Sequence, residues 1–327
     1  MAFPAETAMA VYTPVSSDLL RPLAHALGLT LEGQPEPVAA GIENSTYFFT
    51  ATTGGASGRY VLTLVEMADP DQIRYAARLA VRLADCGLPV PAPLADGFGE
   101  RIHTLAGKPA LIFPRVPGSH PDPVTESHCA VIGDFLARAH RAADGLPGPL
   151  PNRRGVDWLT AATGDLAPLL ADPDGDLLTD QIARYRHLVA TGSGMPTGAI
   201  HGDLFHDNCL FEGNQLRGVI DFYNACHDWL LLDLAIAVSD WCAGEDGHLD
   251  PARYSALVNA YCQARPVTRE EIAQWPTMLA IAATRFWVSR LLGRAGLLKG
   301  TGHAADKDPG EYRRKLLAML GAPPSLG

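Results

Sequence analysis

The segment HGDLFHDN at 201–208 brings together residue types that phosphoryl transfer requires. Transfer from a nucleotide needs a carboxylate near the acceptor hydroxyl, oxygen ligands for Mg²⁺ and a cleft that excludes water. Asp203 supplies a carboxylate, and the amide of Asn208 follows five residues later. Asp221 ends a nearby apolar run, and Mg²⁺ prefers oxygen ligands. We therefore predict that Asp203 is catalytic, that Asn208 and Asp221 bind the metal, and that the cofactors are ATP and Mg²⁺.

Two short apolar runs, 209–211 and 217–220, lie between the two predicted metal ligands. They flank a glycine-containing turn, and this pattern is typical of a hairpin. Such a hairpin would bring its two ends, Asn208 and Asp221, to one place. His201 is grouped with the catalytic residues. We expect its ring to be held by neighbouring backbone or by Asp221, and a role as general base stays open.

The same segments resemble a known enzyme family. HGDLFHDN followed by GVIDFYNA is similar to the catalytic and metal-binding segments of aminoglycoside phosphotransferases. The resemblance extends from about residue 9 to about residue 309, and it is most specific to bacterial homoserine kinases. It implies ATP-dependent phosphorylation of the hydroxyl of L-homoserine to O-phospho-L-homoserine, a step towards threonine. The segments that carry it are HGDLFHDNCLF, GVIDFYNACHDWLLLDLAIAVSDWC, MAVYTPVSS, RYVLTLVE and RFWVSRLL.

Hydrophobic periodicity predicts an α+β fold with two lobes, and the resemblance implies that this fold is protein-kinase-like. Residues 1–8 show no periodicity and are interpreted as a disordered extension, with Met9 as a possible native start. We assign 9–115 to a small, antiparallel-sheet, nucleotide-binding lobe, and 116–327 to a larger helical lobe with the catalytic loop and the acceptor site. The expected strands are 38–51, 59–66, 102–105 and 109–113, and the expected helices are 17–27, 71–86, 126–143, 177–190, 230–242, 251–264, 278–292 and 310–320.

The nucleotide side departs from the protein-kinase pattern. Thr63 lies near the position of the third-strand lysine, and the first lysine of the chain is Lys108. The helix after that strand has no interior glutamate, so both members of the usual ion pair are missing; one left alone in a buried site would be destabilising. Arg74 or Arg78 of this helix is expected to reach the phosphates. The other predicted nucleotide contacts are Asn44, Ser45 and Thr46 at the phosphates, and Phe113 and Val116 at the adenine hinge.

The acceptor should be an amino acid if the resemblance holds. Its carboxylate would then require an arginine, because guanidinium groups form charge-assisted, bidentate hydrogen bonds with carboxylates. Arg285 on a late helix is the first choice for this clamp, and Arg290 is the second. We expect Asp233 to cap its helix or to brace the catalytic loop. The predicted substrate-binding residues are Tyr223, Asp240, Arg285 and Trp287.

Composition limits the partners. The 26 Lys and Arg residues against 36 Asp and Glu residues give a formal charge of -10, which opposes attraction to nucleic acids and anionic membranes. The net charge therefore favours a small-molecule substrate. We also expect a cytoplasmic location. The alternatives are a kinase for choline, ethanolamine, hydroxylysine or an aminoglycoside, a non-catalytic nucleotide-binding module, and a hydrolase whose metal is held by His201, Asp203, His206 and Asp207.

Overall fold

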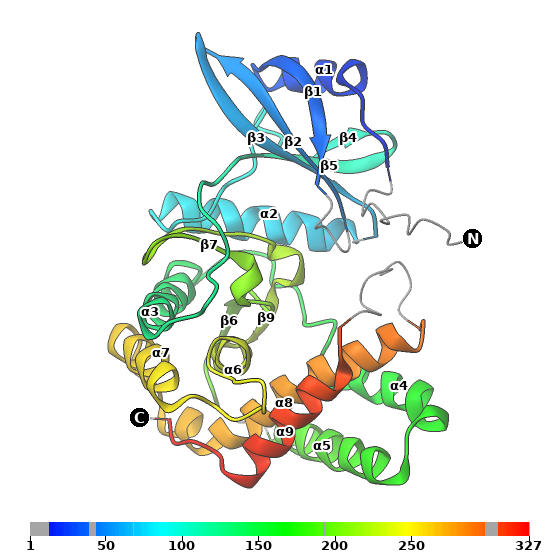
Figure 1. Cartoon of the computed structure of the whole chain (residues 1–327), viewed down its shortest axis with the longest axis vertical. Coiled ribbons are helices and arrows are strands. Elements are labelled where there is room, and N and C mark those ends of the chain that lie inside the picture. Colours follow the sequence, from blue (N-terminus) through cyan, green and yellow to red (C-terminus); the bar gives the residue numbers. More distant parts are fainter. Residues whose placement is uncertain (1–12, 39–43, 68, 192–193, 298–306, 327) are drawn as a thin grey trace, which may run out of the picture.

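The computed structural model describes most of the chain (Figure 1), namely residues 13–38, 44–67, 69–191, 194–297 and 307–326. The expected extension at 1–8 and the start at Met9 lie outside these residues. So do residues 39–43 of the predicted strand 38–51. Within the described ranges, no helix has the length and apolar content that crossing a bilayer requires.

The small lobe is a five-stranded antiparallel sheet in the order β1-β2-β3-β5-β4. Side chains alternate across each strand, so β2 sends every second residue to each face. Tyr47 and Phe49 pack under α1, whereas Thr46 and Phe48 face the cleft between the lobes. The elements are α1 (Ser17–Ala26), β1 (Thr30–Pro37), β2 (Asn44–Thr53), β3 (Ala56–Val65), β4 (His103–Leu105) and β5 (Lys108–Pro114).

Helix α2 (Pro70–Asp85) lies between the sheet and the large lobe (Figure 1). Its Tyr75 and Leu79 belong to the main core of the large lobe. Its Ile73 instead packs with β3 and β5 in a small separate cluster. Gln72 also donates a 2.6 Å hydrogen bond to the carbonyl of Ala225 in the large lobe. The helix is therefore shared between the two lobes.

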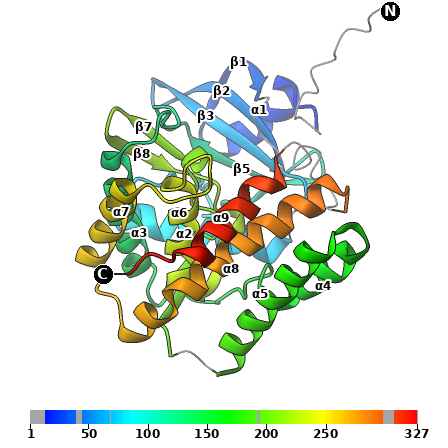
Figure 2. The ribbon, with the colours of Figure 1, turned by 60° about the horizontal axis from the view of Figure 1, so that its bottom comes forward.

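The large lobe is mostly helical, and its core surrounds the buried helix α6. Figure 2 shows α4 and α5 side by side against α8, with α9 along the other side of α8. The helices are α3 (Glu126–Ala142), α4 (Val156–Leu166), α5 (Asp172–Thr191), α6 (Leu230–Trp241), α7 (Pro251–Ala264), α8 (Arg269–Arg294) and α9 (Pro309–Gly321). Two strand pairs, antiparallel β6 (Thr197–Ile200) with β9 (Cys226–Trp229) and β7 (Cys209–Glu212) with β8 (Gln215–Val219), carry the loops of the site.

The predicted α+β arrangement is confirmed, and the predicted hairpin is the β7–β8 pair. The features that were not predicted include β1, α4, the β6–β9 pair and the first turns of α5 and α8. Strand β1 exposes most of its side chains, so it has little apolar alternation. Helix α8 begins at a capping box formed by Thr268 and Glu271 and contains Pro276. That proline hid the first turns, because proline usually interrupts a helix.

Candidate active site

The catalytic loop, residues 201–208, is held from below by a buried carboxylate. Asp233 on α6 accepts 2.8 Å hydrogen bonds from the backbone N–H groups of His201 and Gly202, and it also contacts His140 at 3.1 Å. Gly202 adopts a φ of 75°, and a Cβ there would lie 2.6 Å from the carbonyl oxygen of Asn224. The predicted brace at Asp233 is therefore confirmed, and glycine is required beside it.

His201 is a structural member of the loop. Its Nε2 lies 3.0 Å from the carbonyl oxygen of Ile220, and its Nδ1 accepts a 3.2 Å hydrogen bond from the N–H of Asp203. Nε2 is therefore the protonated nitrogen, and both ring nitrogens are occupied. A general base needs a free nitrogen within reach of the reacting proton. The ring instead fastens the catalytic loop to the end of the hairpin, as expected, and the contact is with Ile220 rather than Asp221.

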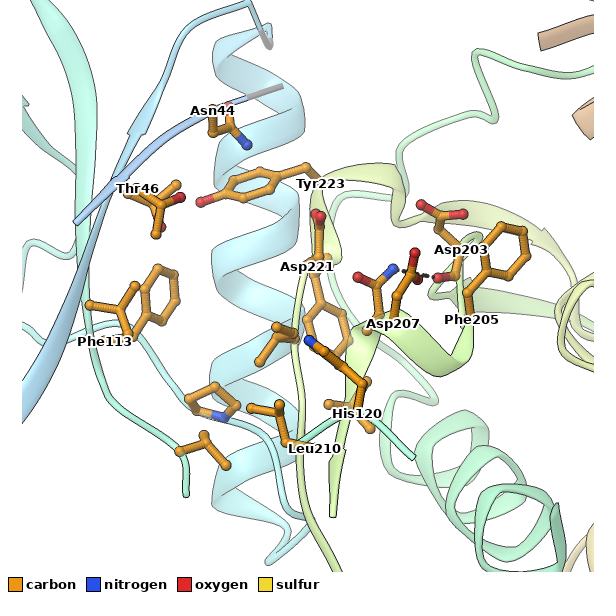
Figure 3. Close-up of a pocket in the computed structure, with 18 of the residues that line it drawn as sticks. Asn44, Thr46, Phe113, His120, Asp203, Phe205, Asp207, Leu210, Asp221 and Tyr223 are labelled. Carbon is orange, nitrogen blue, oxygen red and sulfur yellow. Dashed lines mark hydrogen bonds between the residues drawn. The ribbon is translucent and has the colours of Figure 1, made fainter. Parts of the chain in front are cut away.

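Asp203 presents its carboxylate to the cleft (Figure 3). Its Oδ2 accepts a 3.1 Å hydrogen bond from the amide of Asn224. Burial raises the pKa of Asp203, and the positive charge of Arg285 opposes this rise. A carboxylate with a raised pKa accepts a proton more readily than an ordinary aspartate does.

Asn208 and Asp221 lie at the two ends of the β7–β8 hairpin and both line the cleft. The Nδ2 of Asn208 donates a 2.8 Å hydrogen bond to the carbonyl of Asp203, which assigns its Oδ1 as the group left for a ligand. Asp221 has the left-handed backbone conformation, with φ 64° and ψ 61°. Non-glycine residues rarely adopt it, and they do so mainly at functional sites. This pair of oxygen donors fits Mg²⁺.

The cleft between the lobes has a volume of about 1010 Å³. Phe113 and Val116 line it at the connection between the lobes, as predicted for the adenine hinge. Beside them, the guanidinium of Arg115 lies 3.8 Å from the centre of the Phe48 ring. The remaining apolar wall of this end of the cleft is formed by Val38, Val61, Leu111, Leu210 and Val219.

Because side chains alternate between the two faces of a strand, not all of the predicted phosphate contacts on β2 face the cleft. Asn44 and Thr46 line the cleft. Ser45 points to the opposite face of β2, where its hydroxyl donates a 2.6 Å hydrogen bond to Glu66. Arg74 is also directed away, because it is exposed and pairs with Asp71 at 2.6 Å. The structure thus does not bring Ser45 or Arg74 to the cleft.

Three of the four predicted substrate-binding residues, Asp240, Trp287 and Arg285, are not among the residues that line the cleft. Asp240 accepts hydrogen bonds from the backbone N–H of His206 and contacts its Nδ1, both at 2.8 Å. Trp287 is buried in the core of the large lobe. Tyr223 does line the cleft, but it points towards Thr46 of the small lobe (Figure 3). That position is next to Asn44 and Thr46, which were predicted to contact the phosphates.

Arg285 lies directly beneath the catalytic loop and is only 2% exposed. Its Nη1 is 3.9 Å from the position that a Cβ on Gly202 would occupy. Among the described residues, no hydrogen-bond acceptor meets its Nε or Nη1. Burial lowers the pKa of Arg285, and the charge of Arg154 lowers it further. Two guanidinium groups that repel each other beside Asp203 form a site suited to an anion.

Comparison with known proteins identifies the family. The model of the phosphotransferase enzyme family matches residues 35–270. The chain belongs to this family. It is 39% identical to a homoserine kinase of Pseudomonas aeruginosa over 308 residues, covering 94% of this chain and 96% of that protein. A homoserine kinase of Methylobacillus flagellatus is 40% identical over 320 residues, covering 96% of each chain.

Solved structures confirm the kinase-like fold of this phosphotransferase. Amicoumacin kinase hAmiN, solved in complex with AMP-PNP, Ca²⁺ and Ami, has a TM-score of 0.63 at 16% identity, covering 88% of this chain and 93% of that one. A choline/ethanolamine kinase family protein from Mesorhizobium loti has a TM-score of 0.61 at 17% identity, covering 89% of each chain. The protein is thus a kinase-like enzyme that uses ATP and has an alcohol group as acceptor.

Sequence reasoning missed two polar residues at the site of this phosphotransferase. Arg154 lines the cleft and acts electrostatically on Asp203, but it precedes α4, a helix that was not predicted. In the sequence, Asn224 is visible only as a residue near Asp221. In the structure, its amide donates a hydrogen bond to the carboxylate of Asp203. The spacing of Asn224 after Asp221 was visible in the sequence. No sequence signal pointed to Arg154.

Proposed function

We propose that this phosphotransferase transfers the γ-phosphoryl group of ATP, bound with Mg²⁺, to the side-chain hydroxyl of L-homoserine. The products are ADP and O-phospho-L-homoserine, and the reaction takes place in the cytoplasm as a step towards threonine. The observation that carries the reaction type is the meeting of Asp203, Asn208 and Asp221 at one wall of the cleft. The acceptor is supported by the relatives named homoserine kinase, which match over nearly their full length.

Asp203 is the residue that prepares the acceptor. The amide of Asn224 occupies Oδ2, so Oδ1 accepts the hydrogen bond of the incoming hydroxyl. The carboxylate orients this hydroxyl and takes its proton as the new P–O bond forms. Burial, which raises the pKa of Asp203, makes it a better proton acceptor. The brace from Asp233 keeps the loop in place during the transfer.

Asn208 and Asp221 are the residues that would hold Mg²⁺. When bound, this ion neutralises charge on the nucleotide phosphates. Asn208 is positioned for this by its hydrogen bond to the carbonyl of Asp203. The same hydrogen bond connects the side chain of the proposed metal ligand, Asn208, to the backbone of the proposed catalytic residue, Asp203. Asp221 provides the anionic ligand from the other end of the hairpin.

Arg285 and Arg154 are the residues that would recognise the carboxylate of the acceptor. The guanidinium of Arg285 is buried, and its Nε and Nη1 meet no acceptor among the described residues, which is destabilising unless an anion binds there. Arg290 is less suited, because it already pairs with Glu311 and donates to the carbonyl of Asp308. An amino-acid acceptor supplies the carboxylate, whereas choline and ethanolamine do not.

The test is to measure ADP release with a panel of acceptors at equal concentration. The panel contains L-homoserine, L-serine, hydroxylysine, choline, ethanolamine, an aminoglycoside and 3-amino-1-propanol, which is homoserine without its carboxylate. We expect L-homoserine to have the highest kcat/KM and its product to be O-phospho-L-homoserine. A higher kcat/KM for choline, ethanolamine or an aminoglycoside would reject homoserine and retain the kinase. ATP binding without turnover on any acceptor would favour a non-catalytic module.

The hydrolase alternative has no support in the site. Both ring nitrogens of His201 are engaged by backbone groups. His206 turns its Nδ1 towards Asp240. These two histidines therefore do not converge with Asp203 on a shared metal position.

A further inference from the structure

Tyr223 connects the metal-binding loop to the small lobe. It follows Asp221 by two residues, and its side chain extends towards Thr46 of β2 (Figure 3). Its ring packs beside a small apolar cluster contributed by β3, β5 and α2. The hydroxyl oxygen is buried, and its neighbour is the hydroxyl of Thr63 on β3. A bond between these two hydroxyls uses one of their two O–H donors, so one donor is left for a group that binds there.

Among the described small-lobe residues, no cation lies at this end of the cleft. Thr63 of β3 occupies the position near the lysine of protein kinases, and it lines the cleft. The described small-lobe cations that line the cleft are Arg59 and, at the hinge, Arg115. Arg59 lies four residues from Thr63 along the same strand, or about 13 Å, and its carbonyl accepts a hydrogen bond from the N–H of Arg115. Lys108 pairs with Glu66 at 3.2 Å on another face of the sheet.

The face of α2 towards the cleft has no charge either. Ala76, Ala77 and Ala80 line the cleft from this helix. Its arginines are directed to the large lobe or to solvent, since Arg78 and Arg82 donate to the carbonyls of Gly148 and Ala142. A lysine on β3 would therefore have no carboxylate partner on α2. A neutral donor avoids that unpaired charge.

We propose that the hydroxyl of Tyr223 holds the nucleotide phosphates on the small-lobe side, in place of the third-strand lysine. The phenol donates its O–H to a phosphate oxygen, and the ring holds the segment that carries Asp221 against β2 and β3. This inference rests on the proposed binding of ATP, but not on the identity of the acceptor.

The test compares wild type with Tyr223→Phe by calorimetric titration in the absence of acceptor. The ligands are ATP and ADP, each with Mg²⁺, and adenosine, which has no phosphate. We expect the variant to bind ATP and ADP about tenfold more weakly, since a hydrogen bond to a charged group is lost. Adenosine should bind with unchanged affinity. The melting temperature without nucleotide should fall only slightly, because the deleted hydroxyl meets a single side chain, that of Thr63.

Tyr312→Phe is the matched control. Its hydroxyl is also buried beside a single hydroxyl, that of Ser239, but Tyr312 packs in the large-lobe core and does not line the cleft. This variant should keep the wild-type ratio of ATP affinity to adenosine affinity. The proposal is overturned if Tyr223→Phe also keeps that ratio, or if it weakens ATP and adenosine equally. Failure of wild type to phosphorylate homoserine would reject the acceptor and leave this result intact.

Discussion

The two walls of the nucleotide cleft are built on different principles. The large-lobe wall carries charged and polar groups, Asp203, Asn208 and Asp221, on a loop that is fixed by buried hydrogen bonds. The small-lobe wall carries neutral side chains such as Thr46 and Thr63. In their proposed roles the three large-lobe groups act on the acceptor and the metal, and such roles depend on the charge and the position of each group. Phosphates can be held by neutral donors once a metal neutralises them.

The difference also has an energetic reason. A buried lysine and glutamate stabilise each other, but either one alone is strongly destabilising. Helix α2 presents Ala76 and Ala77 to the cleft where a glutamate would be needed. Loss of both charges leaves no unpaired ion. The following predictions test whether function depends on the large-lobe wall to the extent that this contrast implies.

Asp203→Asn should produce the largest effect. The amide keeps the size of the side chain but cannot take the proton of the hydroxyl, so kcat should fall by about 100-fold to 10,000-fold. Steady-state kinetics with homoserine measures this change. The Kd for ATP with Mg²⁺, measured by titration, should stay within about twofold because Asp203 acts on the acceptor. A kcat near that of wild type would remove Asp203 from the mechanism.

Arg285→Ala should affect the acceptor and spare the nucleotide. Loss of a charge-assisted contact should cost roughly 2–4 kcal/mol of transition-state binding, or about 30-fold to 1000-fold in kcat/KM for homoserine. The preference for homoserine over 3-amino-1-propanol should shrink by a similar factor, with the KM for ATP unchanged.

Arg290→Ala is the matched control for the clamp, because this arginine lies on the same helix and is already paired with Glu311. It should keep the preference for homoserine. Arg154→Ala provides a second test if Arg285→Ala does not fold. A preference retained in both Arg285→Ala and Arg154→Ala would move the carboxylate site elsewhere.

Asp221→Ala should weaken Mg²⁺-dependent ATP binding by about 10-fold to 100-fold, because the ion loses its anionic ligand. Asn208→Ala should act in the same direction with a smaller factor, since its ligand is neutral. Titration of ATP with and without Mg²⁺ separates the metal contribution from the rest. Equal ATP affinity of Asp221→Ala and wild type in Mg²⁺ would show that Asp221 does not bind the metal.

The pH profile of kcat/KM should report the raised pKa of Asp203. Only the deprotonated carboxylate can take the hydroxyl proton, so activity should fall as pH decreases through the folded-state pKa. Burial raises that pKa, so the acidic limb should lie above the usual range of aspartate, with about tenfold loss per pH unit below it. The residual activity of Asp203→Asn should lack this limb. An acidic limb at the ordinary aspartate value would contradict the effect of burial.

Lys108→Ala and Arg74→Ala should produce the smallest effects. Neither residue lines the cleft, because Lys108 pairs with Glu66 and Arg74 pairs with Asp71. Each substitution should change the Kd for ATP by less than about twofold, since surface ion pairs contribute little. A large loss of ATP affinity in either variant would show that a small-lobe cation acts on the phosphates. It would also weaken the contrast between the two walls of the cleft.

Much of the molecule followed from local sequence patterns. The helices α2, α3, α6 and α7 and the antiparallel pair β2–β3 were predicted from their sequence patterns. The spacing of Asp203 and Asn208, with the hairpin that leads to Asp221, predicted one site, and these residues do meet in one cleft. Such features are encoded within a short stretch of chain. Strand alternation was equally visible, and it could have shown that Ser45 faces away from Thr46.

Other features are determined only by the tertiary structure, because they depend on segments that are far apart in the sequence. An arginine on an amphipathic helix is usually exposed, but the packing of α8 beneath the catalytic loop buries Arg285 beside Gly202. The same packing places Trp287 in the core. Tyr223 was expected at the acceptor, yet the direction of its side chain puts it against the small lobe. Sequence spacing determined which residues could do the chemistry, whereas the docking of the lobes and of α8 decided which neighbours each one has.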